Sequence, residues 1–203
     1  MVSEQIAHVG RVADRGASTR ATLLAAAREV FMQQGYAQAA ITDIVALAGA
    51  SVGSLYHHFA GKADLYLALY EDLDNAREAR TRAAVRELRE AGAADPMLLL
   101  LAGARGYLEE CIEQREMAAI FTRGDGPPGF ELTWRRGVLD WVTRNTEFFA
   151  RSGETLDEAA AIVMTGALML AVTEVSLAVD DDRARQLADG VLAVLARLGS
   201  RRP

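Results

Sequence analysis

The stretch from Ala40 to Lys62, AITDIVALAGASVGSLYHHFAGK, constrains the fold of this chain more than any other. Apolar residues recur at helical spacing over residues 41–48, which predicts a first helix. Gly49 ends that helix, because glycine tolerates the positive φ that a sharp turn between two helices requires. A second helix over Val52–Phe59 buries Leu55 on its inner face. Two short helices joined by a tight turn form a helix-turn-helix, whose second helix enters the major groove of DNA.

A longer pattern surrounds this motif. Its parts are Phe31, Gly35-Tyr36, Asp43-Ile44, Ala48-Gly49, Ser51, the run Gly53–Phe59, and Lys62 at the start of a further helix. On these residues Thr19–Leu69 resembles the N-terminal domain of the TetR (tetracycline-repressor-like) family of bacterial transcriptional regulators. The resemblance covers about the first third of the chain, and the remainder matches only in length and helical character.

The chain departs from the family pattern at four positions. Ala39 and Ala40 stand where the family usually has a capping Thr or Ser, so we expect Thr42 or Asp43 to cap the first helix of the motif instead. Val45 replaces a small Ala at the crossing of the two helices, and Val52 replaces a common polar residue, which removes one DNA contact and leaves methyl groups able to touch a thymine.

The resemblance implies a set of DNA-binding residues. Tyr56 and Lys62 are the strongest candidates for phosphate contacts. Ser51 is placed to cap the second helix through its hydroxyl. His57 and His58 are adjacent on a helix, so they point about 100° apart and cannot chelate one metal together; the alternative to DNA contact is plain solvent exposure. The full predicted set is Thr42, Ser51, Val52, Gly53, Ser54, Tyr56, His57, His58 and Lys62.

The net charge of −6 argues mildly against a DNA-binding protein, but the charge is unevenly distributed. Residues 1–62 carry a net charge of +1, and the remainder carries −7. The acidity therefore belongs to the second part of the chain. A nucleoid-type structural DNA-binding protein would need more positive charge than this.

The helical periodicity predicts an all-α fold of about nine helices. Together with the resemblance, it implies three parts: a flexible arm over residues 1–17, a three-helix DNA-binding domain over 18–77, and a helical effector-binding and dimerisation domain over 78–203. Outside the motif, the predicted helices are Ser18 or Thr19 to Gly35, Lys62–Ala91, Pro96–Gln114, Glu116–Thr122, Phe130–Arg151, Leu156–Val179 and Arg183–Leu198. The charged middle of the Lys62–Ala91 helix is interpreted as a solvated face.

The resemblance also implies an effector cavity in the second domain. Trp134 and Trp141 lie seven residues apart on one helical face, so we expect a mostly apolar or aromatic effector there, with too few charges nearby for a highly charged ligand. Glu174 either binds a cationic ligand, pairs with an Arg across a dimer interface, or reaches the surface. For most of the aromatic and methionine residues in the predicted set, a close-packed core is the alternative. The full predicted effector-binding set is Met97, Leu101, Tyr107, Phe121, Trp134, Trp141, Phe148, Met164, Met169 and Glu174.

Other classes of site find little support. The loop Arg123–Gly129 lacks the spacing and lysine of a nucleotide-binding loop, so we interpret it as a connector. Four glutamates over residues 109–116 lack the histidine partners of a di-metal site, so we expect no metal and no cofactor. The single Cys111 and the absence of a signal-peptide pattern indicate a cytoplasmic protein, and the apolar run Ala159–Val172 is too short to span a bilayer.

Taken together, the sequence predicts a homodimeric transcriptional repressor that is not an enzyme. It would bind a palindromic operator in double-stranded DNA and be released by a small apolar or aromatic effector, with no membrane partner. The alternative is an α-helical enzyme or carrier that binds small molecules without a transcriptional role, and it is disfavoured because the sequence shows no nucleophile–base pair, metal cluster or phosphate loop.

Overall fold

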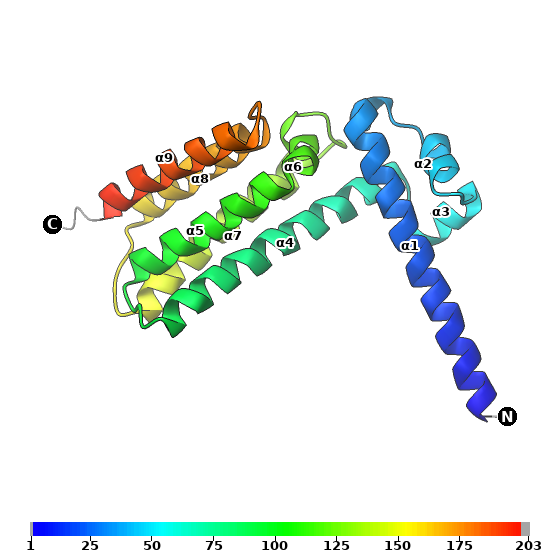
Figure 1. The fold of residues 1–203 in the computed structure, drawn as a ribbon, viewed down its shortest axis with the longest axis horizontal. Coiled ribbons are helices and arrows are strands. Elements are labelled where there is room, and N and C mark those ends of the chain that lie inside the picture. The colour runs from blue at the N-terminus through cyan, green and yellow to red at the C-terminus, as the bar shows by residue number, and fades with distance from the viewer. Residues whose placement is uncertain (1, 200–203) are drawn as a thin grey trace. The chain divides into compact units, whose positions relative to one another are not determined.

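The computed structural model describes residues 2–199 and, between Ala17 and Leu198, their side chains. Over these residues the chain forms nine α-helices and no strand, so the all-α prediction is confirmed (Figure 1). The helices are α1 (Val2–Gln38), α2 (Ile41–Leu47), α3 (Val52–His58), α4 (Lys62–Glu90), α5 (Pro96–Glu113), α6 (Arg115–Thr122), α7 (Phe130–Arg151), α8 (Glu158–Ser176) and α9 (Asp181–Gly199).

The chain divides into two compact units. The first contains residues 1–72 together with the short segment 124–127, and the second contains residues 73–123 and 128–203. The division falls within α4, after Asp72, five residues before the boundary at 77 that the sequence predicted. Each unit is described by itself below.

The first helix of unit 1 corrects one prediction. The expected stop at Gly35 is confirmed, because α1 is interrupted there by a φ of 77°. The expected start at Ser18 or Thr19 is wrong, since the helix is already formed from Val2. Residues 2–17 contain no proline, and a helix that is already nucleated gains one hydrogen bond for each residue that it adds. The predicted arm is therefore helical from its second residue.

The core of unit 1 is aliphatic and aromatic. Leu23, Ala27 and Phe31 from α1 are fully buried, as are Ile44 from α2 and Leu55 from α3. At the other end of this core the rings of Phe31, Tyr36 and Tyr66 contact one another, with centroids 5.1 to 5.9 Å apart. Burial, followed by the nearby charge of Asp125, raises the pKa of the Tyr66 phenol well above its usual value. This core fixes α2 and α3 against α1.

Unit 2 is a helical bundle around one apolar core. Helix α5 packs against α8 and α9, α8 also packs against α9 and α7, and α6 covers part of α8. Leu108 and Cys111 from α5, Val175 from α8 and Leu195 from α9 are almost fully buried in this core. The stripes of apolar residues that predicted these helices are therefore the faces that meet.

The packing of α5 against α4 depends on two small residues. A Cβ atom on Gly106 would lie 3.0 Å from the backbone oxygen of Arg80 and 3.2 Å from Cβ of Ala84. A Cβ atom on Gly103 would lie 3.1 Å from methyl groups of Thr81 and Val85. The absence of a side chain at these two positions thus lets α4 and α5 approach closely.

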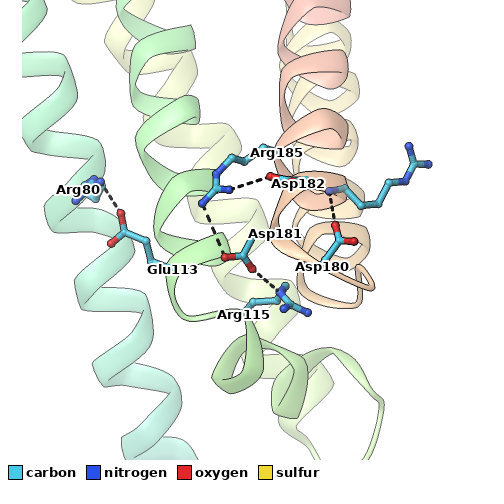
Figure 2. A network of polar contacts seen from close by, with 8 residues as sticks. Arg80, Glu113, Arg115, Asp180, Asp181, Asp182 and Arg185 are labelled. Atoms are coloured by element: carbon cyan, nitrogen blue, oxygen red, sulfur yellow. Dashed lines mark hydrogen bonds and ion pairs between the residues drawn. The ribbon is translucent and has the colours of Figure 1, made fainter.

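Ion pairs join the helices of unit 2 at their surfaces. Arg80 of α4 binds Glu113 of α5 at 2.8 Å. Arg115, at the start of α6, donates to Asp181 at 3.2 Å and to the carbonyl of Ala178 at 2.7 Å. Figure 2 shows how Asp181 lies between Arg115 and Arg185, so that the turn before α9 is tied to the start of α6. One of the four glutamates over residues 109–116, Glu113, is therefore the partner of an arginine on α4.

Helix α8 passes the length and composition test for a membrane span, the one helix to do so in the described part of the chain. Its 19 residues exceed the apolar run that the sequence analysis considered too short. Met164, Leu168 and Val175 on one face are buried in the bundle core, which is also how the central helix of a globular domain behaves.

Candidate nucleic-acid interface and effector cavity

The turn between α2 and α3 has the geometry of a helix-turn-helix. Gly49 has a φ of 61°, the amide of Ala50 donates to the carbonyl of Val45 at 2.9 Å, and the amide of Gly49 donates to Ala46 at 3.2 Å. This pair of bonds is the Schellman arrangement, which uses a left-handed glycine to end a helix. The hydroxyl of Ser51 accepts from the Ser54 amide at 3.1 Å, so its predicted capping role is confirmed.

The expected substitute cap on α2 is wrong. Ala40 is the N-cap residue, and no side chain, neither Thr42 nor Asp43, caps the helix by a hydrogen bond. Asp43 lies in the first turn of α2, where its negative charge interacts favourably with the positive end of the helix dipole.

Helix α3 presents a polar and aromatic face to solvent. Tyr56 is 56% exposed, Val52 is 43% exposed, and Ser51, Gly53 and His57 are exposed. Ser54 and His58 are half-buried, and Thr42 is exposed on α2. The buried side of α3 is held by Leu55 alone. Val52, Gly53, Tyr56 and His57 thus share one exposed face of α3.

Gly53 stands out on this surface. Its φ is not positive, and a Cβ atom there would meet only the Ser51 hydroxyl oxygen, at 3.9 Å. The fold of this unit therefore does not require glycine at position 53. A missing side chain on an exposed helix face does allow close approach by another molecule.

Lys62 is the exception among the predicted DNA-binding residues. Its Nζ donates to the carbonyl oxygens of Tyr36, Ala37 and Ala39 at 2.7, 3.2 and 2.9 Å, and it lies 4.4 Å from the centroid of the Tyr36 ring. An ammonium group has three N–H donors, and these three bonds use all of them. A phosphate contact would have to displace one of these carbonyls, so the geometry disfavours that role.

The loop between α6 and α7 is more than the plain connector that the sequence suggested. Asp125 accepts from the amide of Ala37 through both carboxylate oxygens, at 3.0 and 3.2 Å. A Cβ atom on Gly35 would lie 2.5 Å from Oδ2 of Asp125, so only glycine leaves room for this contact. The segment 124–127 thereby becomes part of unit 1.

A cavity of 790 Å³ lies in unit 2 between α4, α5 and α7. Its apolar wall includes Leu99, Leu100 and Ala104 from α5 and the rings of Trp141 and Phe148 from α7. Its volume falls in the range of pockets for small organic molecules, about 300–1,000 Å³. This is the best-formed candidate for an effector site in the described part of unit 2.

The rest of the lining is strongly basic, which corrects the expectation that few charges are available to a ligand. Five arginines line the cavity, against two glutamates: Arg82, Arg86, Arg89, Arg144 and Arg151, with Glu78 and Glu90. The guanidinium of Arg89 lies 5.5 Å from the centroid of the Phe148 ring, so charge and aromatic surface meet inside the cavity.

A buried polar group lies behind the aromatic wall. The Trp141 ring contacts the Tyr107 ring at 5.2 Å, and the guanidinium of Arg77, which is 4% exposed, lies 5.4 Å from the Tyr107 centroid. Burial raises the pKa of Asp74 nearby, although Arg77 opposes this shift. Burial likewise raises the pKa of the Cys111 thiol. A molecule that displaces Trp141 would therefore also disturb the contact of Tyr107 with Arg77, which belongs to α4.

Comparison with known proteins concerns the N-terminal domain first. Residues 23–69 match the family model described as bacterial regulatory proteins of the tetR family. These residues form a TetR-type N-terminal domain. TtgR of Pseudomonas putida, named an HTH-type transcriptional regulator, is 35% identical over 79 residues. These residues are 39% of this chain and 38% of TtgR, so the chain matches well under half the length of that relative.

Solved TetR-family structures extend the likeness to the whole fold. A TetR-family regulator from Pectobacterium atrosepticum has a TM-score of 0.61 and 29% identity, covering 91% of this chain and 94% of that one. SmeT in complex with triclosan has a TM-score of 0.67 and 21% identity, covering 87% of this chain and 91% of that one. At the latter identity the likeness concerns the fold alone.

The predicted effector residues of this chain do not gather in one place. Only Trp141 and Phe148 line the cavity. Tyr107, Phe121 and Met164 are buried in the bundle, and Met97, Leu101 and Met169 are half-buried, as the packed-core alternative required. Trp134 is 41% exposed outside the cavity, and Glu174 is exposed on α8, which fits the surface alternative.

The arginines were missed because their positions on α4 looked like a solvated face. One signal was available on α7. Arg144 and Arg151 are seven residues apart, as are Trp141 and Phe148, so a basic row runs beside the aromatic row on one side of that helix.

Proposed function

We propose that this chain is a transcriptional repressor that binds a palindromic operator as a homodimer through α3 and is released by a small-molecule effector. The observation that carries the proposal is the exposed polar and aromatic face of α3, held by a helix-turn-helix within the stretch that matches the TetR family. A helix held in this way reads the major groove through its exposed side chains, while phosphate contacts fix its register.

Tyr56 is the best test of this interface. Its side chain is 56% exposed on α3 and carries a hydroxyl that can donate to a phosphate. Tyr56→Ala should weaken binding to a selected operator by at least about tenfold, the loss expected for one good contact. Arg136→Gln removes an exposed charge on α7 and should leave affinity unchanged. Equal affinity of Tyr56→Ala and the wild-type chain would contradict the role given to α3.

The homodimer is supported by the outer surface of α8 and α9. Ile162, Val163 and Leu170 on α8 are 53 to 63% exposed, and Val194 and Leu198 on α9 are 47 and 49% exposed. Large exposed apolar side chains on two helices that pack together support an interface there, because contiguous apolar surfaces are uncommon on monomers. A twofold dimer would present two copies of α3 to two operator half-sites about one helical turn, or a multiple of it, apart.

The effector is proposed to bind in the cavity of unit 2 against Trp141 and Phe148. Its binding releases DNA if it favours one spacing of the two α3 helices over the spacing that fits the operator. SmeT binds triclosan within the same fold, which supports a small aromatic ligand for this chain as well. Binding should change the emission of Trp141 and weaken operator binding at the same ligand concentrations.

A further inference from the structure

The cavity contains a position already built to hold a carboxylate. The two carboxylate oxygens of Glu78 bind two arginines from different helices: Oε1 accepts from Arg144 of α7 at 2.7 Å, and Oε2 accepts from Arg82 of α4 at 3.0 Å. All three residues line the cavity. Burial alone would raise the pKa of Glu78, but the hydrogen bonds and charges of Arg144 and Arg82 outweigh it and hold the pKa below its usual value.

Positive charge exceeds what Glu78 can neutralise. Glu78 and Glu90 are the only acidic residues lining the cavity, against five arginines, although the chain as a whole carries a net charge of −6. Guanidinium groups bind carboxylates with two parallel hydrogen bonds and stack on aromatic rings. Arg89, over the Phe148 ring, makes the second kind of contact. The cavity thus combines an apolar wall with an excess of groups that recognise an acid.

We propose that the effector is an organic acid whose apolar body lies against Trp141 and Phe148 and whose carboxylate takes the place of Glu78 at Arg144 and Arg82. This inference rests on the proposed function only in calling the ligand an effector. The binding chemistry stands on the cavity alone.

The exchange gives the acid a specific effect on unit 2. Arg144–Glu78 is a direct polar link between α7 and α4. When a ligand carboxylate binds Arg144, that link is replaced by one through the ligand, and Glu78 loses a partner. A ligand without a negative charge can fill the apolar part of the cavity but cannot make this exchange. Acids should therefore bind more tightly than neutral molecules of the same shape.

The experiment compares matched pairs of probes on the intact chain. The aromatic pair is 2-naphthoate and 2-naphthamide, and the aliphatic pair is decanoate and decanamide. Binding is measured by calorimetry and by Trp141 emission in a Trp134→Phe background, since Trp134 lies outside the cavity. We expect at least one acid to bind about tenfold or more tightly than its amide, as one charge-assisted bidentate contact would give.

Three variants separate charge recognition from a general effect on folding. Arg144→Gln should reduce the affinity for the acid about tenfold and leave that for the amide within about twofold. Glu78→Gln, which removes the internal competitor, should raise the affinity for the acid and leave that for the amide unchanged. Arg136→Gln, on α7 outside the cavity, should change neither affinity.

Several results would overturn the proposal. They are equal affinities of acid and amide in both pairs, an Arg144→Gln variant that weakens both members of a pair equally, and no binding of either acid at millimolar concentration. Operator release is measured separately. An acid that binds as described yet leaves DNA affinity unchanged would refute the effector role in the proposed function while supporting the recognition of acids.

Discussion

Lys62, the only lysine of the chain, holds the end of α1 through three carbonyl oxygens. A compact ammonium group fits this cluster of acceptors, whereas the planar guanidinium of arginine does not. Lys62→Met should therefore lower the free energy of unfolding by about 2 kcal/mol, the range for hydrogen bonds to a charged group. Thermal and urea denaturation measure this loss, and Lys62→Arg should recover little of it.

A Lys62→Met variant that unfolds like the wild-type chain but binds operator more weakly would contradict this role. That result would instead support the phosphate contact of Lys62 that the family resemblance implied. The comparison requires a stability measurement beside every DNA-binding measurement at this position.

Substitution of Gly53 should change the stability in the opposite direction from substitution of Lys62. Because nothing in the fold crowds a Cβ atom there and φ is not positive, Gly53→Ala should stabilise unit 1 by about 0.5–1 kcal/mol. The same methyl group would stand on the surface proposed to face DNA, so operator affinity should fall about tenfold or more. A variant that is more stable and binds DNA as well as the wild-type chain would show that the surface around Gly53 does not approach DNA closely.

Local chemistry explains which residues could be assigned from the sequence. Gly35 and Gly49 interrupt helices through their own backbone conformation, and Ser51 caps α3 through an amide only three residues away, so the local pattern was sufficient for these roles. Lys62 and Asp125 act on partners 23 to 26 and 88 residues away, and no local pattern records such partners. The resemblance placed Lys62 at the correct position but not its partners.

Helices α4 and α7 are linked through the ion pair of Glu78 with Arg144. The folded-state pKa of Glu78 is lowered, so its contribution to stability is fully present above the usual glutamate pKa, about 4.3, and is lost as the pH falls through the lower folded value. Glu78→Gln should thus lower stability at pH 7 by no more than about 1 kcal/mol, because the pair is partly exposed.

The check is a series of thermal denaturations between pH 7 and pH 3. The difference in Tm between the wild-type chain and Glu78→Gln should shrink as the pH falls below the usual carboxylate range. A difference that stays constant over this range would show that the pair with Arg144 does not stabilise the folded protein.

Periodicity was sufficient for the helices and their buried faces, but not for the roles of their polar faces. The apolar stripes of α5 and α9 predicted both helices to within one or two residues, because burial in the core leaves a repeated signature. The outer side of α4 is different, since arginines around a cavity and arginines in bulk solvent occur in the same sequence pattern. Only the position of α7 beside α4 distinguishes the two, and that position depends on tertiary packing.

The proposed dimer is the property of the whole molecule that can be tested most simply. Val163 and Leu170 lie seven residues apart on α8, so they share one exposed face. Leu170→Glu should convert a dimer into a monomer at micromolar concentration, because a buried charge would face its own copy across a twofold axis. Leu132→Glu places the same charge at a 62% exposed leucine on α7 and should leave the dimer intact. Sedimentation equilibrium distinguishes these outcomes, and a monomeric wild-type chain would refute the proposed assembly.

The central claim is that unit 1 reads a specific operator through α3. The most direct test is selection of bound duplexes from a random DNA pool, followed by affinity measurement at fixed salt concentration. We predict enrichment of a twofold-symmetric sequence that binds at least about 10³-fold more tightly than random DNA, with this preference reduced in Tyr56→Ala. No enriched sequence, or equal affinity for the enriched and random duplexes, would contradict the account.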